Sequence, residues 1–304
     1  MSLSASAKTD IKLEAVNVVW GREECRQVTF VDDSSGSLSA QYWDINTLDS
    51  SYAETQYYVW LDNGSSVDPA PAGKTGIQVT YSNDDTAATI AGLFVTALAA
   101  LDLNVSQSGA EVIYENKYVG IVSEEDQSNA ALLTFAELAV GVGGDLGSTA
   151  QGGTTLTMET QSVELKSDQT GELVLGEIYT GSLASADMTL IEMTKERWET
   201  VVGSVTGDKF TPSGGTRLVG YGKSRLYQNL FDLGGKLILH PIRLDASDRS
   251  EDIVFWRSAP KPASINYSGT DQQGMEVTFV AYNDEGKPEE ISLFAQGDWQ
   301  QDLV

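Results

Sequence analysis

The C-terminal third of the chain restricts the fold most, because residues 217–284 contain several consecutive segments with strand patterns. Residues 236–243 are almost continuously apolar, which is typical of a strand covered on both faces. Residues 275–281 instead alternate between apolar and polar side chains, as a half-exposed strand does. Between them, residues 252–256 are rich in β-branched and aromatic side chains. These segments predict a core built of β-strands.

The charge balance changes sharply within the 304-residue chain. Residues 28–156 contain 17 acidic residues and only two basic ones, Lys74 and Lys117, while the whole chain has a formal net charge of −25. A length above the usual size of one domain, combined with such a break in composition, indicates two folding units. We therefore expect a discontinuous core unit, residues 1–27 and 157–304, interrupted by a separate unit at 28–156.

The inserted segment 28–156 has the pattern of a small α+β unit. The runs that predict strands are 57–61, 77–81, 112–114 and 118–122. A long helix is expected after Asn83, because apolar residues recur there at helical spacing and Asp84 or Asp85 can act as the N-cap. The apolar stripe of this helix consists of Ile90, Phe94, Leu98 and Leu101. A second, shorter helix is expected at 129–140.

In the core unit, further strand patterns surround one short helical pattern. The predicted strands are 11–20, 172–179, 188–192 and 291–294. A turn at 181–187 is expected to separate the second and third of these strands. The short helix is expected at 194–202, with Thr194 as its N-cap and Gly203 as its C-terminal stop.

Side chains that could carry catalysis or bind metals are scarce. His240 is the only histidine and lies in an apolar strand pattern, so we interpret it as a packed or interfacial side chain. Cys25 is the only cysteine, which excludes an intrachain disulfide and a multi-cysteine metal site. The strings GKT at 73–75 and GKS at 222–224 lack the spacing of a phosphate-binding loop. We therefore expect no enzymatic activity, no cofactor and no metal ion.

The acidic composition also restricts the partners. Proteins bind nucleic acids mainly through Lys and Arg, so a net charge of −25 opposes direct binding. The acidic run 124–126 lacks the order of ligands of a calcium loop, and we interpret it as solvated charge. No stretch reaches the roughly 20 apolar residues of a membrane span, and residues 1–10 lack the apolar region of a secretory signal. We expect a soluble protein without a membrane anchor.

Three sequence blocks together resemble a known family. They are IKLEAVNVVWGREE at 11–24, LILHPIRLDASDRSEDIVFWRSAP at 237–260 and GMEVTFVAYNDEG at 274–286. Over residues 1–27 and 157–304 the chain resembles the tail tube (major tail) proteins of tailed bacteriophages. This resemblance implies a mainly β tail-tube fold, a β-sandwich or barrel with one short flanking helix, that assembles into stacked hexameric rings. Residues 57–79 are similar to a small domain found in various phage structural proteins.

The resemblance also implies partners and a location. The partners would be other copies of the chain, the tape-measure, tail-terminator and baseplate or tip proteins, and genomic DNA that passes through the tube without specific binding. The protein would assemble in the host cytoplasm and reside in the virion tail, with 28–156 on the tube exterior. Ring contacts are expected from 1–10, 181–187 and 206–215. The acids expected to face the lumen, where they would repel DNA, are Asp245, Asp248, Glu251, Asp252 and Glu276.

Two other functions are compatible with these patterns. The chain could be another tail-ring component, such as a tube initiator or terminator. It could also be a surface adhesin or carbohydrate-binding protein that uses Tyr57, Tyr58 and Trp60 to stack on sugars, although these aromatics lie in a strand pattern that favours burial. Electron microscopy separates the three functions, which predict long tubes, isolated rings and monomers.

Overall fold

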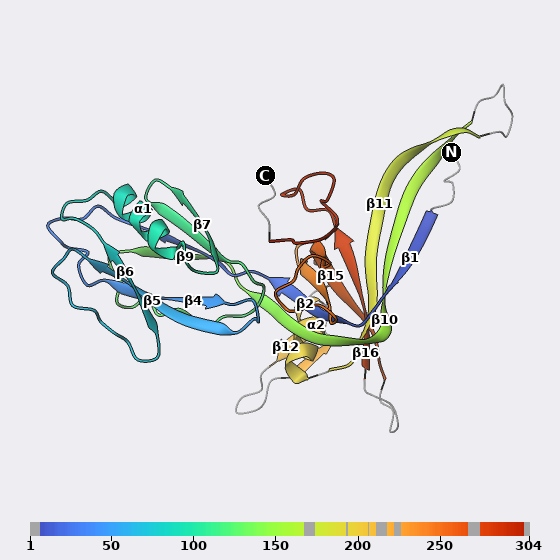
Figure 1. Cartoon of the computed structure of the whole chain (residues 1–304), viewed down its shortest axis with the longest axis horizontal. Helices are drawn as coiled ribbons and strands as arrows, with labels where there is room; N and C mark the ends of the chain where they lie inside the picture. The colour runs from blue at the N-terminus through green and yellow to red at the C-terminus, as the bar shows by residue number, and fades with distance from the viewer. Residues whose placement is uncertain are drawn as a thin grey trace. The chain divides into compact units, whose positions relative to one another are not determined.

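The chain folds into two compact units of mainly β structure (Figure 1). The computed structural model describes residues 7–166, 174–192, 194–205, 207–210, 218–221, 226–266 and 274–300. The core unit consists of Met1–Trp20 and Asp145–Val304, and the inserted unit is Gly21–Gly144. The described residues contain two helices and several sheets, most of them antiparallel.

The inserted unit begins before residue 28 and ends before residue 156, the boundaries expected from the sequence. At its start, β3 (Cys25–Thr29) pairs with β8 (Glu111–Asn116) and β9 (Thr134–Ala139). At its end, β10 (Val142–Lys166) already pairs from Thr154 onward with β1 (Ala7–Leu13) of the core unit. Strands β2 (Val16–Arg22) and β10 cross the two boundaries, so the unit is displaced from the segment 28–156 expected from the charge break.

Eight strands form the sheet of the core unit. Their order is β1-β10-β11-β16-β15-β14-β2, with β17 paired to β15 and an additional pairing between β2 and β10. The remaining bounds are β11 (Val174–Leu190), β14 (Gly235–Pro241), β15 (Ile253–Asn266), β16 (Gly274–Tyr282) and β17 (Ala295–Gln296). The predicted strand 11–20 is therefore two strands, β1 and β2. The predicted strand 291–294 is wrong, because only Ala295–Gln296 pairs there.

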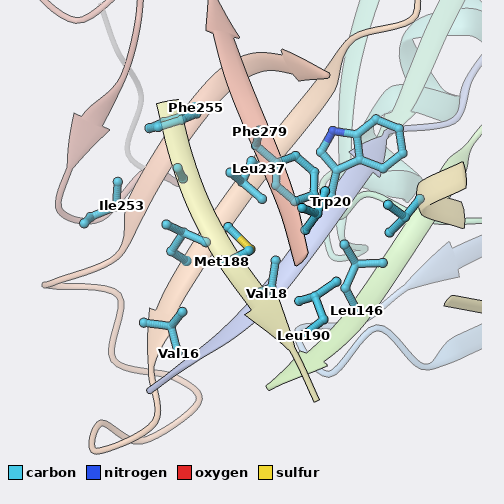
Figure 2. Close-up of a cluster of buried hydrophobic side chains, with 14 of the residues drawn as sticks. Val16, Val18, Trp20, Leu146, Met188, Leu190, Leu237, Ile253, Phe255 and Phe279 are labelled. Atoms are coloured by element: carbon cyan, nitrogen blue, oxygen red, sulfur yellow. The ribbon is translucent and has the colours of Figure 1, made fainter. Parts of the chain in front are cut away.

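Apolar side chains from β2, β10, β11, β14, β15 and β16 pack into one cluster (Figure 2). Trp20 is fully buried in it, its indole Nε1 donates to the Ser258 carbonyl oxygen at 3.0 Å, and its ring centroid lies 6.2 Å from that of Phe279. Each large side chain buried in this way stabilises the fold by about 1.5–3 kcal/mol. The alternating pattern of 275–281 thus has its apolar side chains in the core, as predicted from the sequence.

Helix α2 (Lys195–Val205) begins where the sequence predicts. The Thr194 hydroxyl oxygen accepts a hydrogen bond from the Arg197 amide at 3.3 Å, and the helix contributes Val201 and Val202 to the core cluster. The predicted stop at Gly203 is wrong, because the helix continues to Val205. Two short strands follow, β12 (Gly207–Phe210) and β13 (Leu218–Tyr221), and pair with each other.

Strand β11 runs without interruption through the turn that was expected at 181–187. Residues 181–187 pair with β10, and from Ser185 onward the same strand also pairs with β16. Small and polar residues have a weak preference for strands, but pairing with a neighbour overrides that preference. The turn expected at 181–187 is therefore wrong, while a contact of these residues with a neighbouring subunit stays a prediction.

The inserted unit contains two sheets and one helix around an apolar cluster of its own. One sheet consists of β4 (Tyr42–Leu48), β5 (Glu54–Asp62) and β6 (Thr75–Thr80), with β5 and β6 parallel. The other has the order β7-β8-β3-β9, in which β7 is Leu103–Ser108. Helix α1 (Ala87–Leu98) buries Ile90, Phe94 and Leu98 in the cluster, as its spacing predicts.

Three expectations for the inserted unit are corrected. The N-cap of α1 is Thr86, because Asp85 accepts from the Ser82 amide and Asp84 has a left-handed backbone with φ of 66°. The helix expected at 129–140 is wrong, because residues 134–139 pair with β3 along their whole length. Residues 118–122 form no strand, and β8 pairs instead with β7 and β3.

Candidate functional site

Two of the acids expected in the lumen, Asp245 and Asp248, lie on exposed turns between β14 and β15. The Asp245 carboxylate accepts hydrogen bonds from the Ser247 amide at 3.0 Å and hydroxyl at 2.8 Å, and Asp248 accepts one from the Ser250 amide at 3.0 Å. The backbone bond from Ser247 lowers the pKa of Asp245, and the hydroxyl of Ser250 lowers the pKa of Asp248. Both carboxyl groups are therefore ionised at neutral pH.

Two further acids that were expected to line the lumen, Glu251 and Glu276, differ in solvent exposure. Glu276 is exposed on β16 and accepts a hydrogen bond from the Ser264 hydroxyl at 2.7 Å. Glu251 is half-buried and forms an ion pair with Arg243, which also lies 3.1 Å from a Glu14 carboxylate oxygen. The one positive charge of Arg243 is thus shared by Glu251 and Glu14, while the charge of Glu276 is not neutralised by a cation in the described residues. Their position in a lumen stays a prediction.

The fifth acid, Asp252, cannot line a lumen, because it is 0% exposed. One carboxylate oxygen lies 2.6 Å from His240 Nδ1. The other accepts a hydrogen bond from Trp299 Nε1 at 3.0 Å and lies 3.5 Å from Arg249 Nη1. The expectation for Asp252 is wrong because this residue directly precedes the buried start of β15 and is enclosed with it. The interpretation of His240 as a packed side chain is confirmed.

The Asp252 network, formed by Asp252, His240, Arg249 and Trp299, connects the end of the described chain to β15. The Gly297 amide donates to the Asp252 carbonyl oxygen at 2.8 Å, and β17 pairs with β15. The Arg249 guanidinium lies 5.9 Å from the Trp299 ring centroid, within the range of a cation–π contact. No sequence motif predicts this network, because Trp299 is 47 residues from Asp252 in the chain.

Strands β10 and β11 extend as a two-stranded ribbon past their neighbours (Figure 1). We define the ribbon as residues 161–166 and 174–184. Strand β1 pairs with β10 only up to Thr160, and β16 pairs with β11 only from Ser185. Within the described residues, the two segments of the ribbon therefore pair only with the strands β10 and β11 to which they belong, and no third strand joins them. The large exposed apolar side chains of the ribbon are Leu165, Ile178, Tyr179 and Leu183.

The exposed apolar side chains make the ribbon a candidate assembly surface. Ile178 and Tyr179 are adjacent in the strand, so they point to opposite faces, and Tyr179 is 61% exposed. A strand edge with free backbone groups and apolar side chains is a template for pairing with another chain. The sequence analysis expected ring contacts at 181–187 but assigned a turn to these residues, and it expected no contacts at 161–166 or 174–180.

The inserted unit contains a cavity of about 380 Å³ beside β9. Its charged lining consists of Arg26 and four glutamates, Glu24, Glu124, Glu125 and Glu137. The Arg26 guanidinium binds the Glu24 carboxylate and lies 3.6 Å from Glu125 and 3.9 Å from Glu137. Carboxylates thus outnumber cations in this lining, which gives the cavity an excess of negative charge.

Glu125 is buried beside this cavity, so the interpretation of run 124–126 as solvated charge is wrong for this residue. Its carboxyl oxygens accept hydrogen bonds from the Asn46 amide at 3.2 Å and the Tyr114 hydroxyl at 2.9 Å. Burial raises the pKa of Glu125 to about 7, although the positive charge of Arg26 acts in the opposite direction. Burial also raises the pKa of Glu24.

The raised pKa of Glu125 predicts a pH-dependent stability of the inserted unit. Between about pH 4.5 and 7 the folded state binds more protons at this group than the unfolded state, so its contribution to stability falls as the pH rises through that window. The loss amounts to at most about 3 kcal/mol. Glu125→Gln should reduce this dependence, with Glu24 supplying the remainder, as measured by urea unfolding with hydrogen exchange of residues 111–116 at pH 5 and pH 8. The exposed Glu111→Gln should leave the pH dependence intact; a wild-type slope in Glu125→Gln contradicts the prediction.

The aromatic residues proposed for sugar binding are mostly inaccessible. Tyr58 and Trp60 are buried in β5, and Tyr57 is half-buried. A stacking platform for a sugar needs an exposed ring face. The adhesin hypothesis therefore loses two of its three stacking residues.

The described residues hold no group of three or more His, Cys, Asp or Glu side chains placed to bind a metal ion. Neither described helix is long and apolar enough to cross a membrane. Cys25 is half-buried, and burial raises the pKa of its thiol. No protein-family model matches the chain, and no curated protein matches it significantly.

Proposed function

We propose that this chain is the tail tube (major tail) protein of a tailed bacteriophage, a structural virion protein with a β-sandwich or barrel core. Stacked hexameric rings of it would form a negatively lined conduit for DNA ejection. Its partners would be the tape-measure, tail-terminator and baseplate or tip proteins, and it would assemble in the host cytoplasm. The inserted unit would lie on the tube exterior.

The position of the family-like sequence blocks supports this proposal. Residues 11–24 contain β2, residues 237–260 contain most of β14 and the first half of β15, and residues 274–286 contain β16. In the sheet order β16-β15-β14-β2, these four strands are consecutive neighbours. The blocks thus form one continuous part of the core sheet rather than scattered segments.

The observation that carries the assembly function is the ribbon, which exposes large apolar side chains and whose outer strand edges pair with no third strand in the described residues. Such a surface favours a partner that buries it. A second copy of the chain can supply that partner, and a head-to-tail contact that closes by rotation produces a ring. Of the contact segments expected from the sequence, 181–184 belongs to the ribbon. Residues 1–6, 206 and 211–215 of the other two segments lie outside the described residues.

Negative-stain electron microscopy of the purified protein tests the proposal. Long tubes of uniform diameter are the expected result. Isolated rings that do not elongate, even with a tape-measure protein present, would identify a tube initiator or terminator instead. A monodisperse monomer at high concentration, together with the absence of the protein from phage tails labelled with an antibody against it, overturns the proposal.

The lumen charge gives a second test. Replacing Asp245, Asp248 and Glu276 by lysine should leave ring assembly intact but slow DNA ejection several-fold at low salt, because new phosphate contacts form. The defect should shrink at higher salt, since each contact releases counterions and is screened over about 8–10 Å. The control replaces three acids of the inserted unit, Glu54, Asp102 and Glu111, by lysine. Normal ejection by the first variant, or equal slowing by both, contradicts an inward position of these acids.

A further inference from the structure

The outer edge of β9 is a second strand edge available to a partner, and it lies in the inserted unit. Strand β9 is the last strand in the order β7-β8-β3-β9 and pairs only with β3. In the described part of the chain, no strand pairs with its other side. An extended peptide can add to such an edge through main-chain hydrogen bonds.

Side chains beside this edge form an apolar wall of the acidic cavity. Phe135 and Glu137 are two residues apart in β9, so their side chains lie on the same face of the strand, and both line the cavity. Val140, just after the strand, also lines it and is 58% exposed. A side chain that enters here therefore meets an apolar surface next to a carboxylate.

The acids of the cavity divide into an inner and an outer pair. Glu24 and Glu125 are buried and lie against the Arg26 guanidinium. Glu124 is exposed, and the side chain of Glu137 is 42% exposed at 3.9 Å from Arg26. The single cation of the lining is thus engaged mainly by the inner pair, so the outer pair can attract a cation from solution.

We propose that the β9 edge and this cavity dock a basic, extended segment of a partner protein. The ammonium or guanidinium group of a Lys or Arg would lie near Glu124 and Glu137, and its methylene groups would pack against Phe135 and Val140. Backbone groups of the segment would extend the sheet beyond β9. A second copy of the chain fits poorly, because its 44 acidic and 19 basic residues repel an acidic site. The inference is independent of tube formation.

The test uses the full chain and a fluorescent eight-residue peptide of alternating Lys and Val, with binding followed by anisotropy. The peptide should bind and should protect the amides of β9 from hydrogen exchange. Glu124→Gln with Glu137→Gln should weaken binding about fivefold or more, because two charge-assisted contacts are lost. The matched control, Asp102→Asn with Glu111→Gln, removes the same charge elsewhere in the unit and should change the affinity less than twofold.

Three results overturn the proposal. Equal weakening by both double variants shows attraction to an acidic surface rather than a site. Comparable binding of a Glu-Val peptide shows that charge complementarity does not select the partner. Full displacement of the peptide by butylammonium, without any protection of β9, identifies a small-molecule cavity instead of a docking edge. Tube formation is scored separately by microscopy, so the two proposals fail independently.

Discussion

Replacing both Ile178 and Leu183 by aspartate should abolish the assembly of rings and tubes while the core unit stays folded. Both side chains are exposed on the ribbon, so the free subunit does not lose core packing. In an assembled state, each substitution removes about 1.5–3 kcal/mol of apolar burial and places a carboxylate where it is desolvated. Since the contact repeats in every subunit, the losses accumulate along the assembly.

Sedimentation velocity and negative-stain microscopy measure the loss of assembly, and circular dichroism with thermal unfolding checks the fold. The matched control is Val67→Asp, because Val67 is 85% exposed in the inserted unit. This control should assemble as the wild type does. Tubes formed by the ribbon variant at wild-type concentrations, or loss of assembly in both variants, contradict the role of the ribbon.

Asp252→Ala should destabilise the core unit by about 3–5 kcal/mol, the cost of breaking a buried ion pair by removing one partner. The substitution removes the acceptor for Trp299 Nε1 and the negative charge beside the buried Arg249 and His240. Because Trp299 then loses a hydrogen bond, the segment that contains β17 should also become accessible. Urea unfolding measures the first effect, and limited proteolysis after residue 283 measures the second.

Asp245→Ala provides the control for this prediction. Asp245 is exposed and its carboxylate accepts hydrogen bonds from Ser247, two residues away, so the loss of this side chain should cost less than about 1 kcal/mol. If the two variants unfold at the same urea concentration, the Asp252 network does not stabilise the core unit.

The sequence by itself determined those elements whose side-chain period is strong and local. The alternation of 275–281 predicted β16, and the spacing of Ile90, Phe94 and Leu98 predicted α1, because burial of one face imposes period 2 on a strand and 3.6 on a helix. The capping chemistry of Thr194 likewise predicted the start of α2. The charge break indicated an inserted unit, since composition can change abruptly where one unit interrupts another.

Only the tertiary structure decided the features that depend on partners distant in the chain. Residues 134–139 became a strand because β3 pairs with them, and 181–187 stayed extended because β10 and β16 do. The solvent exposure of the acids also depends on distant partners. Asp252 and Glu125 are buried against groups far away in the sequence, while Asp245 and Glu276 are exposed. The sequence does not distinguish a solvated carboxylate from a buried one, because burial depends on which strands pack around the side chain and not on its neighbours in the chain.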